Sequence, residues 1–275
     1  MRKLFTRLAT QALLALMLLP ASYAASSDAY CSKPVRVAMF EFGVLYRADT
    51  SDGIDVRLLA ELERRSGCTF ERVLLPRSRI WKELQAGRLD MATSAIPTVE
   101  RKAYGYMLPY IKTRNVVLLR RQSGRTVMDQ TDFENSKLRF GVVRGFRHEA
   151  AYDAMVAKLA AQDRVVEAVD VVDLFRLLDR KVVDAILSQP IVYSQYLAPA
   201  RFDEDLSIND WAPADQASIG ALILARASFN ARQAKQWDQL LVNMQSDGTL
   251  YKIVHEFLPA NRARELVYTG PRSPE

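Results

Sequence analysis

The sequence predicts an α/β protein with two lobes and mostly parallel sheets, and two observations support this fold class. Short apolar runs alternate with segments of helical periodicity, which is the βαβ pattern of parallel sheets with right-handed crossovers. This order occurs twice along the 275 residues, and a third block follows it. Two similar units with a returning tail predict two lobes with a cleft between them.

The first unit is predicted to contain three strands separated by two helices. The helix over Ile54–Ser66 has leucines and isoleucine at helical spacing, and Gly87 ends the helix before the third strand. The expected elements are strand Val35–Phe40, helix Ile54–Ser66, strand Thr69–Leu75, helix Arg79–Ala86 and strand Asp90–Ile96.

The second unit repeats this order, and the third block contains one strand and two helices. After an extended run at Val116–Arg121, we expect strand Leu138–Val143, helix His148–Ala160, strand Val165–Ala168, helix Val171–Leu178, strand Val183–Leu187 and helix Ile191–Leu197. The third block has strand Ile219–Leu224, helix Phe229–Met244 and helix Gly248–Phe257. No Pro/Ser-rich linker separates the units, so we expect the crossings between lobes to be extended strands.

The amino terminus predicts export to the periplasm. Three basic residues precede an apolar run at Leu8–Leu19, and small residues suit cleavage after Ala24, so residues 1–24 are interpreted as a signal peptide. The alternative is an uncleaved anchor, which the short span and Pro20 disfavour.

The composition fits one large or two smaller globular domains. Apolar residues make up 49% of the chain, and its net charge of +6 falls to +3 when the three basic residues of the signal are removed. This charge is too small and scattered to indicate nucleic-acid binding.

The chain has two cysteines, Cys31 and Cys68, and an oxidising compartment favours a disulfide between them. Each cysteine directly precedes a predicted strand, so the sulfurs can meet if those strands are parallel neighbours. Two free buried thiols are the alternative. The histidines, His148 and His255, lack ligand-type spacing to the cysteines, so we expect no metal site and no cofactor.

A candidate anion site follows the strand Asp90–Ile96. Ser94 and Thr98 offer hydroxyls here, and Arg101 offers a planar fork of donors that suits a carboxylate. Ligands bind at the carboxyl ends of strands in open α/β sheets, so this loop is well placed. The alternative is that Arg101 lies on a helix and pairs with Glu100 or Asp90.

Several segments together resemble the bacterial periplasmic solute-binding proteins of family 3. They are GIDVRLLAEL at 53–62, LQAGRLDM at 84–91, TVER at 98–101 followed by Leu108-Pro109-Tyr110, KVVDAIL at 181–187 and SDGTLYKI at 246–253. The resemblance covers the mature chain in the right order. It implies the type II periplasmic binding fold with two crossing strands as a hinge, lobe 1 at residues 33–113 plus 217–265, and lobe 2 at 114–216.

In lobe 1, the resemblance implies that Arg101 clamps a ligand carboxylate. Thr98 precedes it by three residues, and the groups just before it, at Ser94, Ala95 and Ile96, would contribute backbone or hydroxyl contacts. Pro97 interrupts this segment and removes one backbone donor.

In lobe 2, this sequence departs from the family at two positions. Where the family places a Gly-Ser or Gly-Thr turn, the chain has Gly145, Phe146 and Arg147, so Arg147 either replaces the missing hydroxyl or is solvated. Backbone N–H groups of this turn can still bind an anion. Where an aspartate commonly holds a ligand ammonium, the chain has the neutral Gln189. A carboxylate without a cationic amine is therefore credible, unless Glu41 supplies the charge; its alternative role is a surface acid.

Further candidates come from the segments after the first two strands. Phe42 and Tyr46 lie where the family places a ring that stacks on ligand. Of Arg77 and Arg79, which flank Ser78, one points into the cleft in this interpretation, and Arg79 is the candidate. A surface position at a helix start is the alternative.

The resemblance implies a monomer that captures a small polar or anionic solute, an amino acid or other carboxylate, for an ABC transporter permease or a membrane sensor. The alternative is a periplasmic enzyme on the same scaffold, such as a cyclohexadienyl-type dehydratase. An acid dehydration needs an acid in the cleft. Gln189 removes one such position and Glu41 leaves another, while no Ser-His-Asp arrangement is evident.

Overall fold

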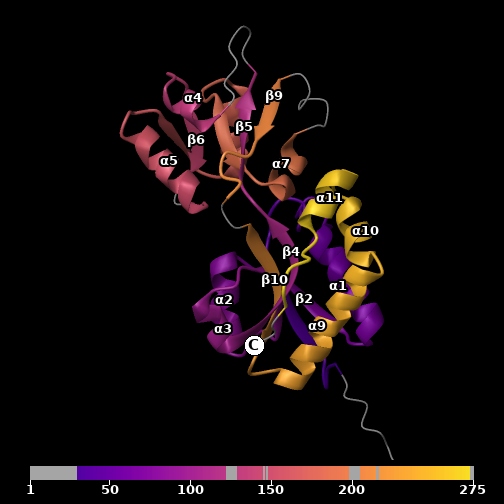
Figure 1. Cartoon of the computed structure of the whole chain (residues 1–275). Helices are drawn as coiled ribbons and strands as arrows, with labels where there is room; N and C mark the ends of the chain where they lie inside the picture. Colours follow the sequence, from indigo (N-terminus) through magenta and orange to yellow (C-terminus); the bar gives the residue numbers. More distant parts are fainter. Residues whose placement is uncertain are drawn as a thin grey trace, which may run out of the picture.

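Two five-stranded mixed sheets with flanking helices form two lobes (Figure 1). The computed structural model describes residues 30–121, 129–144, 146, 148–197, 205–214 and 217–272, so the predicted signal peptide lies outside the described residues. None of the helices in these ranges is both long and apolar enough to cross a bilayer.

The first sheet has the strand order β2-β1-β3-β10-β4, and β1 pairs in parallel with both β2 and β3. The βαβαβ arrangement predicted for the first unit is therefore confirmed. Its elements are β1 (Val35–Met39), α1 (Ile54–Ser66), β2 (Phe70–Leu74), α2 (Arg77–Gln85), β3 (Met91–Ala95), α3 (Val99–Tyr104) and β4 (Gly105–Thr113). The chain later returns to this lobe with β10 (Ser218–Ala225), α9 (Ala231–Ser246), α10 (Thr249–His255) and α11 (Ala260–Leu266).

The second sheet has the order β7-β6-β8-β5-β9, and β6 pairs in parallel with β7 and β8. The elements are β5 (Val116–Arg120), α4 (Gln130–Glu134), β6 (Phe140–Val143), α5 (Ala150–Ala160), β7 (Val165–Ala168), α6 (Val171–Asp179), β8 (Ala185–Ser188), α7 (Pro190–Tyr196) and β9 (Leu206–Asn209). The two sheets thus repeat one arrangement, as the repeated order of the sequence predicts.

The sheets are mixed because each contains strands next to the crossings between lobes. The chain crosses between β4 and β5 and again between β9 and β10, whereas the exact lobe limits at 113/114 and 216/217 stay a prediction. β10 runs antiparallel to β3 and β4, and β5 runs antiparallel to β8 and β9. Parallel pairing is therefore confined to one half of each sheet.

Several elements escaped the sequence prediction, and β4 shows why. Pro109 lies within this strand, and a proline normally argues against a strand in mid-sheet because it cannot donate to the ladder. Here it pairs with Ala221 at a register shift in β10, where the hydrogen-bond ladder is already interrupted. The other unpredicted elements are α3, α4, β9 and α11, which are short.

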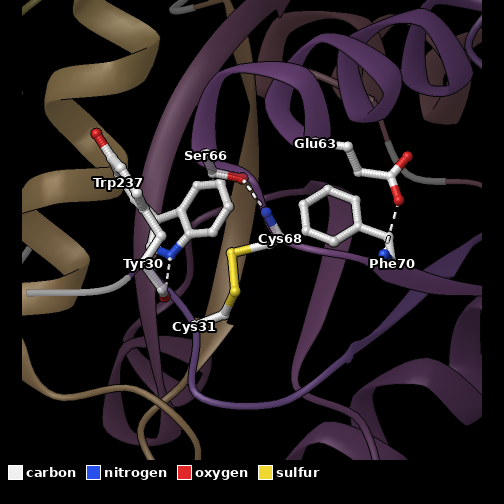
Figure 2. The surroundings of a disulfide bond; sticks show 7 residues. All are labelled: Tyr30, Cys31, Glu63, Ser66, Cys68, Phe70 and Trp237. Atoms are coloured by element: carbon white, nitrogen blue, oxygen red, sulfur yellow. Dashed lines mark hydrogen bonds between the residues drawn. A yellow bond between two sulfur atoms is a disulfide. The ribbon is translucent and has the colours of Figure 1, made fainter.

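The predicted disulfide between Cys31 and Cys68 is present (Figure 2). It joins the segment before β1 to the turn before β2, and these strands are parallel neighbours with Val35 opposite Phe70. Around it, the indole N–H of Trp237 donates to the carbonyl of Tyr30 over 3.2 Å. The disulfide therefore ties the start of the described chain to the edge of the first sheet, and the Trp237 hydrogen bond ties it to α9.

A main-chain hydrogen bond joins the two lobes. The N–H of Val44, in the loop between β1 and α1, donates to the carbonyl of Ile191 in α7 over 2.7 Å. The neighbouring Gly43 has φ of +54°, and a Cβ there would lie 1.9 Å from the same carbonyl oxygen. This approach therefore requires glycine at position 43. Buried apolar residues continue across the contact, so one core cluster includes Leu45 of the first lobe and Ile191 and Val192 of the second.

Candidate functional site

A cavity of about 390 Å³ lies between the lobes, and both lobes contribute to its walls. This volume is in the range of small-molecule sites. Of the residues predicted from sequence, those that line it are Phe42, Ser94, Ile96, Phe146 and Gln189. Those that do not line it are Arg101, Thr98, Ala95, Glu41, Tyr46 and Arg79. Gly145 and Arg147 lie outside the described residues.

Among the described residues, Arg77 is the arginine that lines the cavity. It is the first residue of α2, which begins two residues earlier than predicted, with Pro76 at the N-cap. Its guanidinium lies 5.1 Å from the centre of the Phe40 ring, and among the described residues no carboxylate lies close enough to affect its charge. Burial, together with the nearby charge of Arg101, lowers the pKa of Arg77. A half-buried cation with no acidic partner suits an anionic ligand.

Arg79, the arginine chosen from sequence, occupies the surface instead. Its side chain is 64% exposed and lies 3.6 Å from Glu83, one turn further along α2. Position 79 is on the face of the helix opposite the buried Ile80 and Leu84 side, so the alternative of a surface position at a helix start applies to this residue.

Arg101 is held close to the cavity but does not line it. Its Nη1 donates to the carbonyl of Ile96 over 2.7 Å, and its guanidinium lies 4.1 Å from the centre of the Trp81 ring. Thr98 is the N-cap of α3 and accepts the backbone N–H of Arg101. Arg101 therefore lies on a helix, but Asp90 pairs with Arg36 rather than with Arg101. Its carboxylate-clamping role stays a prediction.

Ser94 lines the cavity, but its polar groups are directed into the protein. Its hydroxyl donates to Asp55 over 2.8 Å and lies 2.8 Å from the hydroxyl of Tyr110, to which its backbone N–H also donates. Tyr110 in turn donates to Asp55 over 2.5 Å. Burial raises the pKa of Asp55 to about 6, against the opposing effect of these hydroxyl donors. Ser94 also has φ of +54°, which is unusual for a residue other than glycine.

The second lobe contributes a carboxylate that the sequence prediction missed. Glu149 lines the cavity at the start of α5 and accepts two hydrogen bonds from Asn115, one from its backbone and one from its side chain. Asn115 follows the first crossing between lobes, so the pair links that crossing to α5. No local motif marks it, because the two residues are 34 positions apart.

His148 and Ser188 are further lining groups in the second lobe. His148 is held by Asp153, with 3.3 Å between Nδ1 and the carboxylate. Ser188 ends β8 immediately before Gln189, and its buried hydroxyl has no hydrogen-bond partner among the described residues. Its position at a strand end next to Gln189 is the sequence signal that could have identified it.

Gln189 and Phe146 occupy the positions that depart from the family. Gln189 is the N-cap of α7, but its side chain makes no capping hydrogen bond. Phe146 is 47% exposed, with its ring 6.4 Å from that of His148. Neither side chain carries a charge, so among the described lining residues the arginine and the carboxylate are Arg77 and Glu149. In the described ranges, no group of three or more His, Cys, Asp or Glu side chains is arranged to hold a metal ion.

Comparisons with known proteins place these features in a wider context. Residues 36–260 match the model of the bacterial extracellular solute-binding proteins, family 3. No curated protein matches the sequence.

Solved structures share the fold at low sequence identity. An ancestral cationic amino acid solute-binding protein aligns with a TM-score of 0.64 at 16% identity, covering 82% of this chain and 95% of that one. The L-cystine solute receptor of Neisseria gonorrhoeae, in its unliganded open conformation, aligns with a TM-score of 0.63 at 20% identity over 84% and 95%. The arginine-, lysine-, histidine-binding protein of Geobacillus stearothermophilus gives 0.59 at 18% over 84% and 100%.

Proposed function

We propose, from the premise that this chain belongs to the bacterial extracellular solute-binding proteins of family 3, that it captures a small carboxylate-bearing solute in the periplasm. An amino acid is the first candidate. The bound protein then presents the solute to an ABC transporter or to a membrane sensor, and it acts as a binding protein rather than as an enzyme. The solved structures named above are binding proteins or receptors for amino acids, which supports this class.

The observation that carries the proposal is Arg77, a half-buried guanidinium that lines the cavity without an acidic partner in the described part of the chain. An arginine can hold a carboxylate through two parallel hydrogen bonds, and partial burial strengthens the interaction. A ligand carboxylate at this position would also relieve the repulsion between Arg77 and Arg101. Arg101 is then a second candidate for the same carboxylate.

Glu149 supports an amino acid over a simple carboxylate. Gln189 provides no charge for a ligand ammonium, but the Glu149 carboxylate lies on the second-lobe wall of the same cavity. A zwitterion would therefore meet a cation on one lobe and an anion on the other. Contacts from both lobes are what allow a ligand to stabilise a closed arrangement.

The test is a thermal-shift screen of the oxidised protein against amino acids, their deaminated analogues, dicarboxylates and polyamines. A ligand at one hundred times its Kd adds about 2.7 kcal/mol of stability, which such a screen detects. We expect α-amino acids to stabilise the protein and polyamines to have no effect. Stabilisation only by carboxylates without an amine would contradict the role of Glu149 in binding a ligand ammonium. If none of the compounds raises the melting temperature, the proposal is contradicted.

Matched arginine variants then test the site. Replacing Arg77 with Gln should weaken the binding of the selected ligand by roughly 10- to 100-fold, the usual range for a charged hydrogen bond. Arg79→Gln is the control, because it removes the same charge two residues away on the exposed face of α2. Arg101→Ala should also lose binding if the family role applies. Equal affinities of the Arg77 and Arg79 variants, measured by calorimetry, would show that the anchor is misassigned.

Recovery of the ligand tests the choice of binding over catalysis. After prolonged incubation with the oxidised protein, mass spectrometry should find the selected ligand unchanged. Conversion that stops in the Glu149→Gln variant would instead favour an enzyme that uses this acid.

A further inference from the structure

Most of the described residues that line the cavity are apolar, and several of them belong to the core cluster that continues from one lobe into the other. The half-buried Phe42 and Val171 line the cavity and pack against this cluster. Buried lining residues within the cluster include Leu45, Val143, Leu174, Ile191 and Val192. We call these seven residues the apolar wall.

The apolar wall restricts which part of a ligand can lie against it. An apolar group that covers the wall removes both its own surface and that of the wall from water, which is favourable. A charged or polar group in the same place loses its hydration and gains no hydrogen bond or ion pair from these side chains. The wall therefore favours an apolar portion of the ligand.

The charged groups of the described cavity lining already have roles in the proposed function. Arg77 holds the ligand carboxylate and Glu149 its ammonium. Glu149 also accepts two hydrogen bonds from Asn115, and His148 is held by Asp153. Among the described lining residues, no further carboxylate, lysine or arginine remains for a charged ligand side chain. A basic or acidic side chain would therefore leave water without an ionic partner there.

We propose that the solute is an amino acid with an uncharged apolar side chain, and that Val171 is a specificity-determining residue that contacts this side chain. The inference rests on the proposed function, which supplies the roles of Arg77 and Glu149. It differs from the specificity of two similar proteins, one a cationic amino acid solute-binding protein and the other an arginine-, lysine-, histidine-binding protein. Burial of a leucine or phenylalanine side chain strengthens binding by roughly 10- to 150-fold.

Calorimetry with five amino acids tests the ligand class. The probes are glycine, L-leucine, L-phenylalanine, L-arginine and L-glutamate, and glycine reports the contribution of the carboxylate and ammonium alone. Leucine and phenylalanine should bind at least about tenfold more tightly than glycine, because only they cover the apolar wall. Arginine and glutamate should bind no more tightly than glycine. If leucine and phenylalanine bind no better than glycine, or if a charged amino acid binds as tightly as they do, the inference is wrong.

Val171 and Val172 provide a matched pair of variants. Val171 is the first residue of α6 and lines the cavity, whereas Val172 is 49% exposed and does not line it. Consecutive helix positions point in different directions. Val171→Asp should weaken leucine binding at least about tenfold and should strengthen arginine binding relative to leucine. Val172→Asp should bind both ligands as the wild type does. An acid is favourable in the first turn of a helix, so both variants should fold.

Val171→Thr is the milder test, because it keeps the shape of the side chain and adds a hydroxyl. It should weaken leucine binding several-fold and leave glycine binding unchanged, since the hydroxyl loses water only against an apolar ligand group. Thermal melting without ligand checks that each variant is folded. If the folded Val171 and Val172 variants bind leucine equally, Val171 does not contact the ligand side chain.

The outcomes distinguish this inference from the proposed function. If arginine or glutamate binds and leucine and phenylalanine do not, the protein is still an amino-acid-binding protein, but the specificity inferred from the apolar wall is wrong. If none of the five amino acids binds, the proposed capture of amino acids is contradicted, and the inference fails with it.

Discussion

Two serines on opposite walls of the cavity, Ser94 and Ser188, differ in how their polar groups are satisfied. On the first-lobe wall, the hydroxyl and N–H of Ser94 are both bonded to Asp55 or Tyr110. On the second-lobe wall, the buried hydroxyl of Ser188 has no partner among the described residues, and the Gln189 side chain makes no capping bond. Arg77 is the exception on the first wall. The difference indicates that Ser94 is positioned by the protein, while Ser188 and Gln189 retain hydrogen-bonding capacity for a ligand.

The largest expected effect concerns the bracing of the first lobe by the disulfide between Cys31 and Cys68. Replacing both cysteines with serine should lower the free energy of unfolding by roughly 3–4 kcal/mol, because the bridge closes a loop of 37 residues in the unfolded chain. Hydrogen exchange should show the loss in β1 and β2 and leave β6 and β7 protected. Uniform loss of protection in both sheets would contradict a difference between the lobes.

A somewhat smaller loss of stability is expected when the Asp55 carboxyl group, to which Ser94 and Tyr110 hydrogen-bond, is removed. Asp55→Ala leaves two buried hydroxyl groups without their acceptor, which should cost about 2–4 kcal/mol in urea denaturation. Ser188→Ala on the opposite wall should change stability by less than about 1 kcal/mol, because that hydroxyl has no partner to lose. If Asp55→Ala and Ser188→Ala lower the free energy of unfolding by the same amount, the difference between the Ser94 and Ser188 sites is contradicted.

The smallest effect is a pH dependence with opposite sign in the two lobes. The pKa of Asp55 is about 6 in the folded protein against 3.8 in the unfolded chain, so the folded state binds the extra proton and stability falls as pH rises from 4 to 6. The full shift corresponds to at most about 3 kcal/mol. In the second lobe, hydrogen bonds from Gln130 and Lys158 lower the pKa of Glu134, so its contribution is lost as pH falls.

Denaturation of Asp55→Asn and the wild type across pH 4–8 isolates the first of these terms. The stability difference should move in favour of Asn as pH rises and should become constant above pH 7. A difference that is flat over this range would mean that Asp55 is ionised throughout.

The features that the sequence predicted correctly are those that depend on local patterns of residues. Alternating apolar runs predicted the βαβ units, and cysteines preceding two adjacent strands predicted the disulfide, because both depend on residues near each other in the chain or at the same sheet edge. Two elements next to prolines were predicted incorrectly. The strand β4, which contains Pro109, was not predicted. The helix α2 begins at Arg77, directly after Pro76, and Arg77 lines the cavity in place of the predicted Arg79.

Contacts between distant residues could not be predicted in this way. Asn115 hydrogen-bonds to Glu149 because the first crossing between the lobes passes the start of α5. Ser94 hydrogen-bonds to Tyr110 from a backbone conformation with positive φ, which no sequence pattern in β3 indicates. The family resemblance identified five of the lining residues, including Gln189, but not the ones that carry charge. The ligand-binding roles of these residues stay predictions.

The bond from Val44 to Ile191 separates the attachment of the lobes from the choice of ligand. Both partners are main-chain groups, so this hydrogen bond requires the absence of a Cβ at Gly43 but no particular polar side chain on the cavity walls. The side chains on the cavity walls can therefore be exchanged while the lobes keep this point of contact. Such a scaffold can acquire a new solute through substitutions at a few wall positions, without redesigning how its two halves meet.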